Sequence, residues 1–159
     1  PRLAEVVKKK KEAEGVEWLV QANGSLALSI KKGADTVPIE AVHGLCALMW
    51  ARPREAPLSL DLSKKKIGAE GLAALARAMT PTLTSLNLER SDCANSGGNR
   101  SGVLLLGKCL SDASASGSLT SLDVGFNDID RDAALELVAT FKEKQMTFVG
   151  LAGLSLIHI

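Results

Sequence analysis

LTSLDVGFNDI at residues 119–129, followed by RDAALELVATF at residues 131–141, is the stretch that decides the fold of this chain. The first part has the spacing L-x-x-L-x-V-x-x-N-x-I, in which apolar and polar residues alternate around Leu122, as in a short strand with one buried face. In the second part, apolar residues recur every four positions from Ala133 to Phe141 and form one stripe of a helix. The sequence therefore predicts a strand with a helix packed behind it.

The same spacing occurs again upstream, twice clearly and once in a weaker form. The residues that carry it are Leu60, Leu62, Ile67, Gly71, Leu75 and Met79; Leu83, Leu86, Leu88, Cys93, Gly102, Leu106 and Leu110; and, in the weaker copy, Leu28, Ile30, Val37, Ala41, Leu45 and Met49. The middle helix residues Leu45, Leu75, Leu106 and Leu137 follow one another at steps of 30, 31 and 31 residues. Because one unit cannot bury its apolar face alone, the units are predicted to stack into a continuous core.

Over about residues 25–153, this pattern resembles the ribonuclease-inhibitor-like class of leucine-rich repeats, in about four units. That class also occurs in the GTPase-activating proteins of the nuclear-transport GTPase and in the sensor regions of innate-immune receptors. The resemblance implies an α/β leucine-rich-repeat solenoid, a right-handed βα superhelix with parallel strands on the concave face and helices on the convex face. The asparagine of the repeat is present as Asn127, but Lys65 and Ser91 take its place in the two preceding units. Lysine offers no acceptor, so the turn at Lys65 must satisfy its backbone groups in another way or face water.

The two ends of the chain differ from the repeats. We expect residues 1–24 to be an N-terminal helix and hairpin arm, or the remnant of a preceding repeat, because residues 3–14 have helix-forming composition. Asn23-Gly24 lies between two apolar runs and suits the positive φ angles of a type I′ hairpin turn that leads into the first repeat.

The last six residues, LSLIHI at residues 154–159, resemble one reading frame of a transposon-end adapter used to prepare sequencing libraries. We therefore expect a non-native tail there. The alternative is a genuine terminal strand that follows Val149 and Leu151. Since the chain begins with Pro1, we interpret it as a fragment.

Composition narrows the functional classes. With 19 Lys and Arg against 18 Asp and Glu, the net charge of +1 does not favour nucleic acid or an anionic membrane as a partner. Aromatic residues make up 3% of the chain and Tyr is absent, so base stacking is not favoured either. The three cysteines have neither metal-site nor disulfide spacing, which indicates a reducing, cytoplasmic environment and no cofactor or metal.

One stretch imitates a phosphate-binding loop. Residues 102–109 read G-x-x-x-x-G-K-C, which lacks the final Ser or Thr that would bind magnesium. The four intervening residues are Val and Leu in helical register, so we interpret the stretch as a buried helix that carries Leu106 and Leu110.

Residues between and after the inward-facing leucines are predicted to line the concave face. Stacking aligns Ser59, Ser85 and Ser121; Asp61, Asn87 and Asp123; Ser63, Glu89 and Gly125; and Lys64, Arg90 and Phe126. From these columns we select the candidate partner-binding residues Asp61, Asn87, Glu89, Arg90, Asp123 and Phe126. Arg90 and Phe126 are the expected anchors, since Arg and aromatic residues dominate interface energetics.

No catalytic residue, cofactor or small-molecule substrate is predicted. The leading hypothesis is a non-enzymatic module of a larger leucine-rich-repeat protein that binds another protein through its concave face. The alternative is part of a GTPase-activating protein of the nuclear-transport type, whose catalytic loop has no counterpart that we can assign to these residues.

Overall fold

The computed structural model describes residues 16–20, 26–30, 36–51, 57–96, 98–112 and 117–154. In chain order the elements are β1 (Val16–Val20), β2 (Leu26–Ile30), α2 (Ile39–Ala51), β3 (Leu58–Asp61), α3 (Gly68–Arg77), β4 (Leu83–Asn87), α4 (Ser101–Ser111), β5 (Ser121–Asp123), α6 (Arg131–Glu143) and β6 (Phe148–Gly150). Strand and helix alternate from β2 onward, as the sequence predicts. The three clear units correspond to β3–α3, β4–α4 and β5–α6, and the weaker one to β2–α2.

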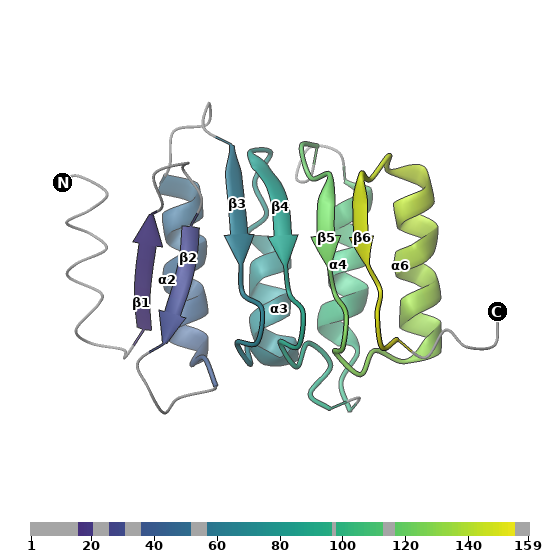
Figure 1. Ribbon diagram of the computed structural model, residues 1–159, viewed down its shortest axis with the longest axis horizontal. Helices are drawn as coiled ribbons and strands as arrows, with labels where there is room; N and C mark the ends of the chain where they lie inside the picture. Colours follow the sequence, from purple (N-terminus) through teal and green to yellow (C-terminus); the bar gives the residue numbers. More distant parts are fainter. Residues whose placement is uncertain are drawn as a thin grey trace.

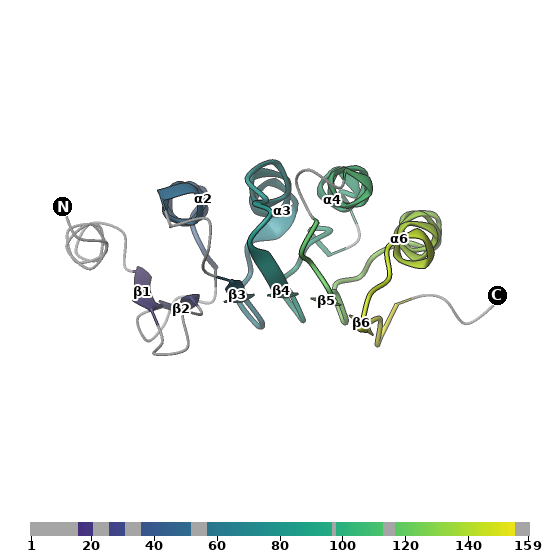
Figure 2. The same ribbon diagram turned by 90° about the horizontal axis from the view of Figure 1, so that it is seen from above.

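The strands form one six-stranded sheet in the order β1-β2-β3-β4-β5-β6 (Figure 1). Neighbouring strands from β2 to β6 pair in parallel, and β1 pairs with β2 in the antiparallel direction. Figure 2 shows α2, α3, α4 and α6 side by side on one face of this sheet. We call the opposite face, which carries none of the described helices, the helix-free face.

The register between β3, β4 and β5 is the predicted one, with Leu60, Leu86 and Leu122 on one line. The register of β2 is not, because Leu26 rather than Leu28 lies beside Leu60. Thr36 forms an isolated β-bridge with Lys66. The chain between Leu26 and Thr36 is therefore longer than the chain between their partners, Leu60 and Lys66. A shift of two residues keeps the same face of a strand buried, and the apolar alternation alone could not reveal it.

In the region of the predicted hairpin, β1 and β2 pair in the antiparallel direction, from Val16↔Ile30 to Val20↔Leu26. Uninterrupted pairing around a two-residue turn at Asn23-Gly24 would place Val20 opposite residue 27, so the observed register does not fit that turn. The turn itself and the helix predicted at residues 3–14 lie outside the described residues.

The core lies between the sheet and the helices. Its strand half comprises Leu58, Leu60, Leu62, Leu83, Leu86, Leu88, Leu119, Leu122 and Val124, and its helix half includes Leu45, Met49, Leu72, Leu75, Leu106, Leu110 and Leu137. All of them are buried, as the repeat pattern requires. None of the described helices combines the length and the apolar character needed to span a membrane.

The stretch that imitates a phosphate-binding loop is the helix α4, as predicted. Both of its glycines are buried, and Gly102 has a packing role: a Cβ there would collide with the carbonyl oxygen of Ala69 in α3. Gly102 therefore lets α3 and α4 approach closely. Because residues 102–109 are helical, they do not form the loop that a phosphate-binding motif requires.

Candidate functional site

Strand pairing arranges the outward side chains of the helix-free face in columns. The first column is Ser59, Ser85, Ser121 and Phe148, and the second is Asp61, Asn87, Asp123 and Gly150. The hydrogen-bond ladder continues into the turns that follow the strands, where Lys64 N donates to Glu89 O, Arg90 N to Gly125 O and Phe126 N to Ala152 O. This extends the alignment to a third column, Ser63, Glu89, Gly125 and Ala152, and a fourth, Lys64, Arg90, Phe126 and Gly153. All six candidate residues thus lie in adjacent columns at one end of the sheet.

The second column has a structural task. In Asp61, Asn87 and Asp123, Oδ1 accepts a hydrogen bond from the backbone N–H two residues later, at 2.9, 3.0 and 2.9 Å. A short polar side chain that bonds its own backbone in this way fixes the turn after each strand. One acceptor of each side chain is therefore engaged within the fold, and the binding role of these three residues stays a prediction.

The last residue of the second column, Gly150, is a glycine for a steric reason. The carboxylate of Asp123 occupies the space that a Cβ at Gly150 would need. Asp123 therefore leans toward β6, and a larger residue at position 150 would displace it.

The fourth column combines unusual backbone with exposed side chains. Lys64, Arg90 and Phe126 have φ angles of 59°, 54° and 54°, in the left-handed region that favours glycine, and Gly153 continues the series at 69°. Lys64 and Arg90 are exposed, and 46% of Phe126 is accessible.

The two predicted anchors, Arg90 and Phe126, are in direct contact. The guanidinium carbon of Arg90 lies 4.7 Å from the centre of the Phe126 ring, a cation–π arrangement. Arg90 Nε also lies 3.6 Å from Glu89 Oε1. On the other side, a Cβ at Gly153 would lie 2.5 Å from Phe126 Cδ1, so the ring rests against glycine backbone. Glu89, Arg90 and Phe126 therefore form one connected group.

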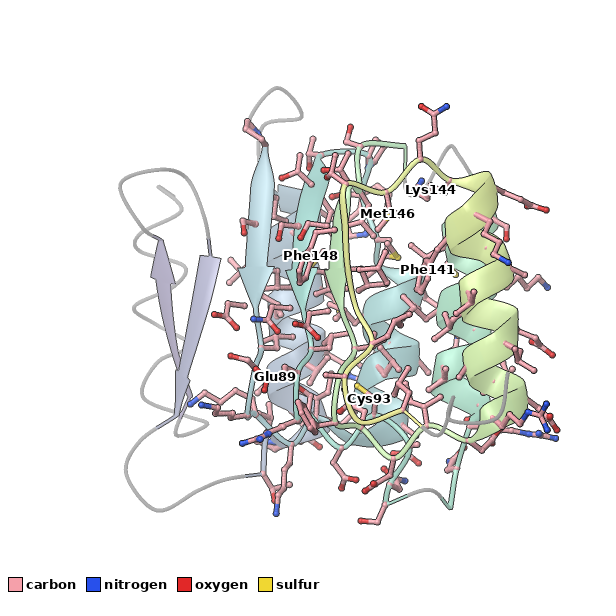
Figure 3. All side chains as sticks on the ribbon, turned by 45° about the vertical axis from the view of Figure 1, so that its right-hand side comes forward. Glu89, Cys93, Phe141, Lys144, Met146 and Phe148 are labelled. Atoms are coloured by element: carbon pink, nitrogen blue, oxygen red, sulfur yellow. The ribbon has the colours of Figure 1, made fainter. Side chains whose placement is uncertain are left out.

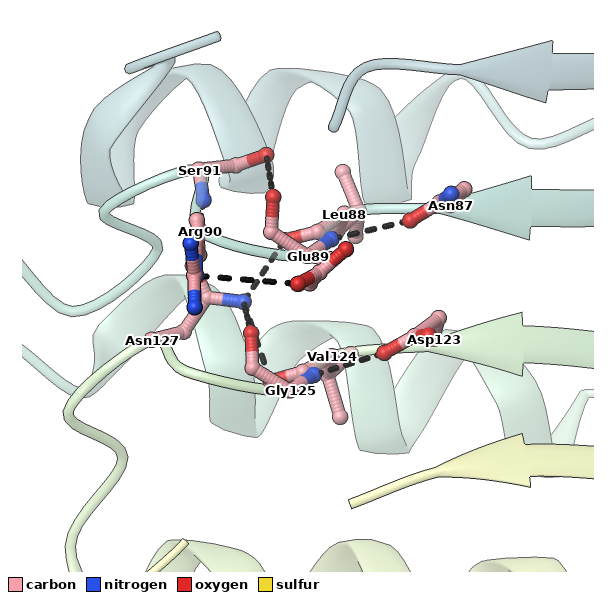
Figure 4. Close-up of polar contacts among 9 residues, drawn as sticks. All are labelled: Asn87, Leu88, Glu89, Arg90, Ser91, Asp123, Val124, Gly125 and Asn127. Carbon is pink, nitrogen blue, oxygen red and sulfur yellow. Dashed lines mark hydrogen bonds and ion pairs between the residues drawn. The ribbon is translucent and has the colours of Figure 1, made fainter. Parts of the chain in front are cut away.

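Hydrogen bonds from two buried polar side chains, Asn127 and Ser91, stabilise these turns (Figure 4). Asn127 Oδ1 accepts from Ser91 N at 2.7 Å and Cys93 N at 3.2 Å, and its amide nitrogen donates to the carbonyl oxygens of Leu88, Val124 and Gly125 at 2.6, 2.9 and 3.1 Å.

One rung earlier, the hydroxyl of Ser91 donates to Leu62 O at 2.7 Å, as the Asn127 amide does to Leu88 O. At Lys65 main-chain groups are the partners, which is one of the two predicted outcomes: Lys65 N donates to Leu62 O and Ile67 N to Ser91 O. In the last rung, the buried Leu154 stands at the Asn127 position, and the rest of the predicted tail, residues 155–159, lies outside the described residues.

Sequence reasoning missed Phe148. Figure 3 shows it on the helix-free face, whereas Phe141 lies between the sheet and α6. Phe148 pairs with Ser121 in the first column and is 52% exposed. The signal was available: Met146, Val149 and Leu151 repeat the L-x-x-L-x-L spacing and predict a strand at this place.

A row of threonines beside the first column was also missed. The hydroxyls of Thr84, Thr120 and Thr147 donate to the carbonyl oxygens of Leu58, Thr84 and Thr120, each on the preceding rung. These bonds join neighbouring strands, so the row contributes to the stack itself.

Two other features, a hollow between α4 and α6 and the cysteine thiols, are weaker candidates for a functional site. A hollow of about 370 Å³ lies between α4 and α6, lined in part by Gly107, Lys108, Glu136 and Thr140. The cysteines are free thiols, and burial raises the pKa of Cys93 to about 12, which keeps it unreactive near neutral pH. Within the described ranges, no group of His, Cys, Asp and Glu side chains could hold a metal ion.

Comparison with known families agrees with the repeat. A family model described as Leucine Rich repeat matches residues 116–138, the segment that spans β5 and the first half of α6. The chain contains a leucine-rich repeat. The other units share with this leucine-rich repeat the strand register, the buried leucines and the helix behind each strand. No curated protein matches the chain in sequence.

Proposed function

We propose that this chain is a protein-interaction module that binds a partner protein through the helix-free face and the turns at the end of β3, β4 and β5. The observation that carries the proposal is the distribution of exposed apolar surface. In the described part of the chain, the large exposed hydrophobic side chains are Trp50, Phe126 and Phe148, and two of these three lie on the strand side of the molecule. Exposed aromatic residues next to an arginine are typical anchors of protein interfaces.

We further propose that the units belong to a right-handed solenoid of the ribonuclease-inhibitor-like class, with the helix-free face on the concave side. Parallel strands joined through a helix are right-handed in nearly all proteins. Each unit places a full helix behind its strand, which supports that class, and the narrower strand layer of such a stack lies inside the curve. The free thiols support a cytoplasmic location.

A photo-cross-linking experiment tests the binding face. Phe148 is replaced by the photo-reactive amino acid p-benzoylphenylalanine in the natural full-length protein, which is expressed in its own cells. The matched control carries the same amino acid in place of Glu136, which is exposed on α6. A discrete cross-linked protein from position 148 and none from position 136 is the expected result. Cross-links from position 136 alone, or from neither position, would contradict the proposed binding face.

A further inference from the structure

The turn after β3 and the turn after β4 gather positive charge at one edge of the helix-free face. We call Lys64, Lys65, Lys66, Arg90 and Phe126 the cationic edge. Lys64, Lys66 and Arg90 are exposed, and no ion pair is formed by the three lysines with any described residue. Lys64 and Arg90 occupy neighbouring rungs of the fourth column, which are roughly 5 Å apart.

Arg90 contacts two neighbouring side chains. The Phe126 ring lies under its guanidinium at 4.7 Å, and Glu89 approaches only Nε, at 3.6 Å. No acceptor among the described residues hydrogen-bonds its two Nη atoms, and the side chain is 55% exposed. A guanidinium that lies over an aromatic ring, with its outer nitrogens free, is suited to a bidentate carboxylate.

The backbone supports a role for these side chains beyond folding. The hydrogen bonds of the fourth column are made by main-chain N–H groups, so the fold does not need Lys, Arg or Phe there. The left-handed φ angles make glycine the least strained choice, and Gly153 takes it in the last rung. Three large side chains at such positions indicate that the side chains themselves are used.

We infer that the cationic edge binds an acidic segment of the partner protein. One carboxylate pairs with the Nη atoms of Arg90, a second with the ammonium of Lys64, and an adjacent apolar side chain packs on the exposed rim of Phe126. The inference rests on the proposed function and names the partner's chemistry. Asp92 and Asp128 each follow a residue of the edge by two positions in the sequence, so we expect a long polyanion to be repelled more strongly than a short acidic segment.

Selection from a random peptide library displayed on phage tests this inference. The whole chain is panned, and the enriched peptides are made synthetically and titrated by fluorescence anisotropy against the wild type and two variants. Arg90→Gln removes the guanidinium group, one of the four positive charges of the cationic edge. The matched control is Arg100→Gln, because Arg100 is also 55% exposed but lies at the start of α4, within 3.9 Å of Asp130 and Asp132. Circular dichroism verifies that both variants are folded.

The expected result is enrichment of Asp and Glu beside an apolar residue, with binding at least about tenfold weaker in Arg90→Gln, unchanged in Arg100→Gln and weaker at higher salt. Peptides without acidic residues, or peptides that bind Arg90→Gln as well as wild type, would overturn the inference and leave the proposed function standing. Absence of any enriched peptide would also overturn it, and the proposed function is then decided separately by cross-linking at position 148.

Discussion

Replacing Asn127 by alanine should destabilise the chain more than any other single polar truncation in its turns. The side chain is 1% exposed and links the turns after β4 and β5 through contacts to Leu88, Ser91 and Cys93 as well as to its own turn. Alanine leaves each of these buried backbone groups without its partner. Water cannot replace the amide unless it enters the core.

The magnitude follows from the hydrogen bonds. Oδ1 accepts two, and the amide nitrogen has two protons to share among three carbonyl oxygens, so four bonds can be formed at full strength. At about 1 kcal/mol net for each, Asn127→Ala should lower the free energy of unfolding by about 4 kcal/mol. Ser91→Ala removes one strong bond, at 2.7 Å to Leu62 O, and should lower it by about 1 kcal/mol.

Urea unfolding followed by circular dichroism measures both changes. The domain as a whole is expected to be stable by roughly 5–15 kcal/mol, so the alanine variant keeps a measurable transition or is visibly unfolded. Asn127→Ser, which restores one donor and an acceptor as at Ser91, should fall between the two alanine variants. If the urea midpoint of Asn127→Ala shifts no more than that of Ser91→Ala, the buried amide does not stabilise the turns after β4 and β5 and the reasoning is wrong.

Further predictions concern the backbone and the thiols. Lys64→Gly should raise the free energy of unfolding by up to about 1 kcal/mol in urea titrations, because it relieves a left-handed residue; a decrease would show that Lys64 contributes to folding. Gly102→Ala should lower it by about 1–3 kcal/mol through collision with the carbonyl oxygen of Ala69. Its control in the same helix, Gly107→Ala, meets its first neighbour only at 3.6 Å and should raise stability by up to about 1 kcal/mol, so equal effects would refute the packing argument. Burial raises the pKa of Cys93 from 9.0 to about 12, so the thiol stays protonated in the folded chain while the unfolded chain ionises. The melting temperature should therefore fall between about pH 9 and 12 more steeply in the wild type than in Cys93→Ala, and parallel curves would contradict this.

The regular parts of the fold could be predicted because they repeat. The inward leucines recur at a fixed spacing, and that spacing alone placed β3, β4 and β5 and the helices behind them. The same spacing aligned Arg90 with Phe126, whose contact is seen in the structure. Where the spacing was interrupted, between β2 and Thr36, the strand register was predicted two residues away from its actual place.

Other features could not be predicted because they depend on groups that the pattern does not specify. The left-handed φ of Lys64 and Arg90 was hidden, since neither is a glycine. The hydrogen bonds that Asp61 and Asp123 accept from their own turns were also hidden, since the spacing does not show which backbone groups need a partner. Phe148 was overlooked because the repeat that contains it was not aligned with the others, although Met146, Val149 and Leu151 continue the leucine spacing around it.

The columns therefore divide between folding and recognition. In the second column the side chains hold the turns, so a change there alters stability whatever it does to binding. The fourth column forms its rungs through main-chain atoms, and its side chains can vary without loss of a rung. Specificity for a partner can thus change most freely in the fourth column. There, glycine would give the more stable backbone, whereas Lys64, Arg90 and Phe126 would provide contacts with the partner. The double variant Lys64→Gly, Arg90→Gly should consequently remain folded but no longer bind the acidic peptides, so stability and binding can be changed separately within one column.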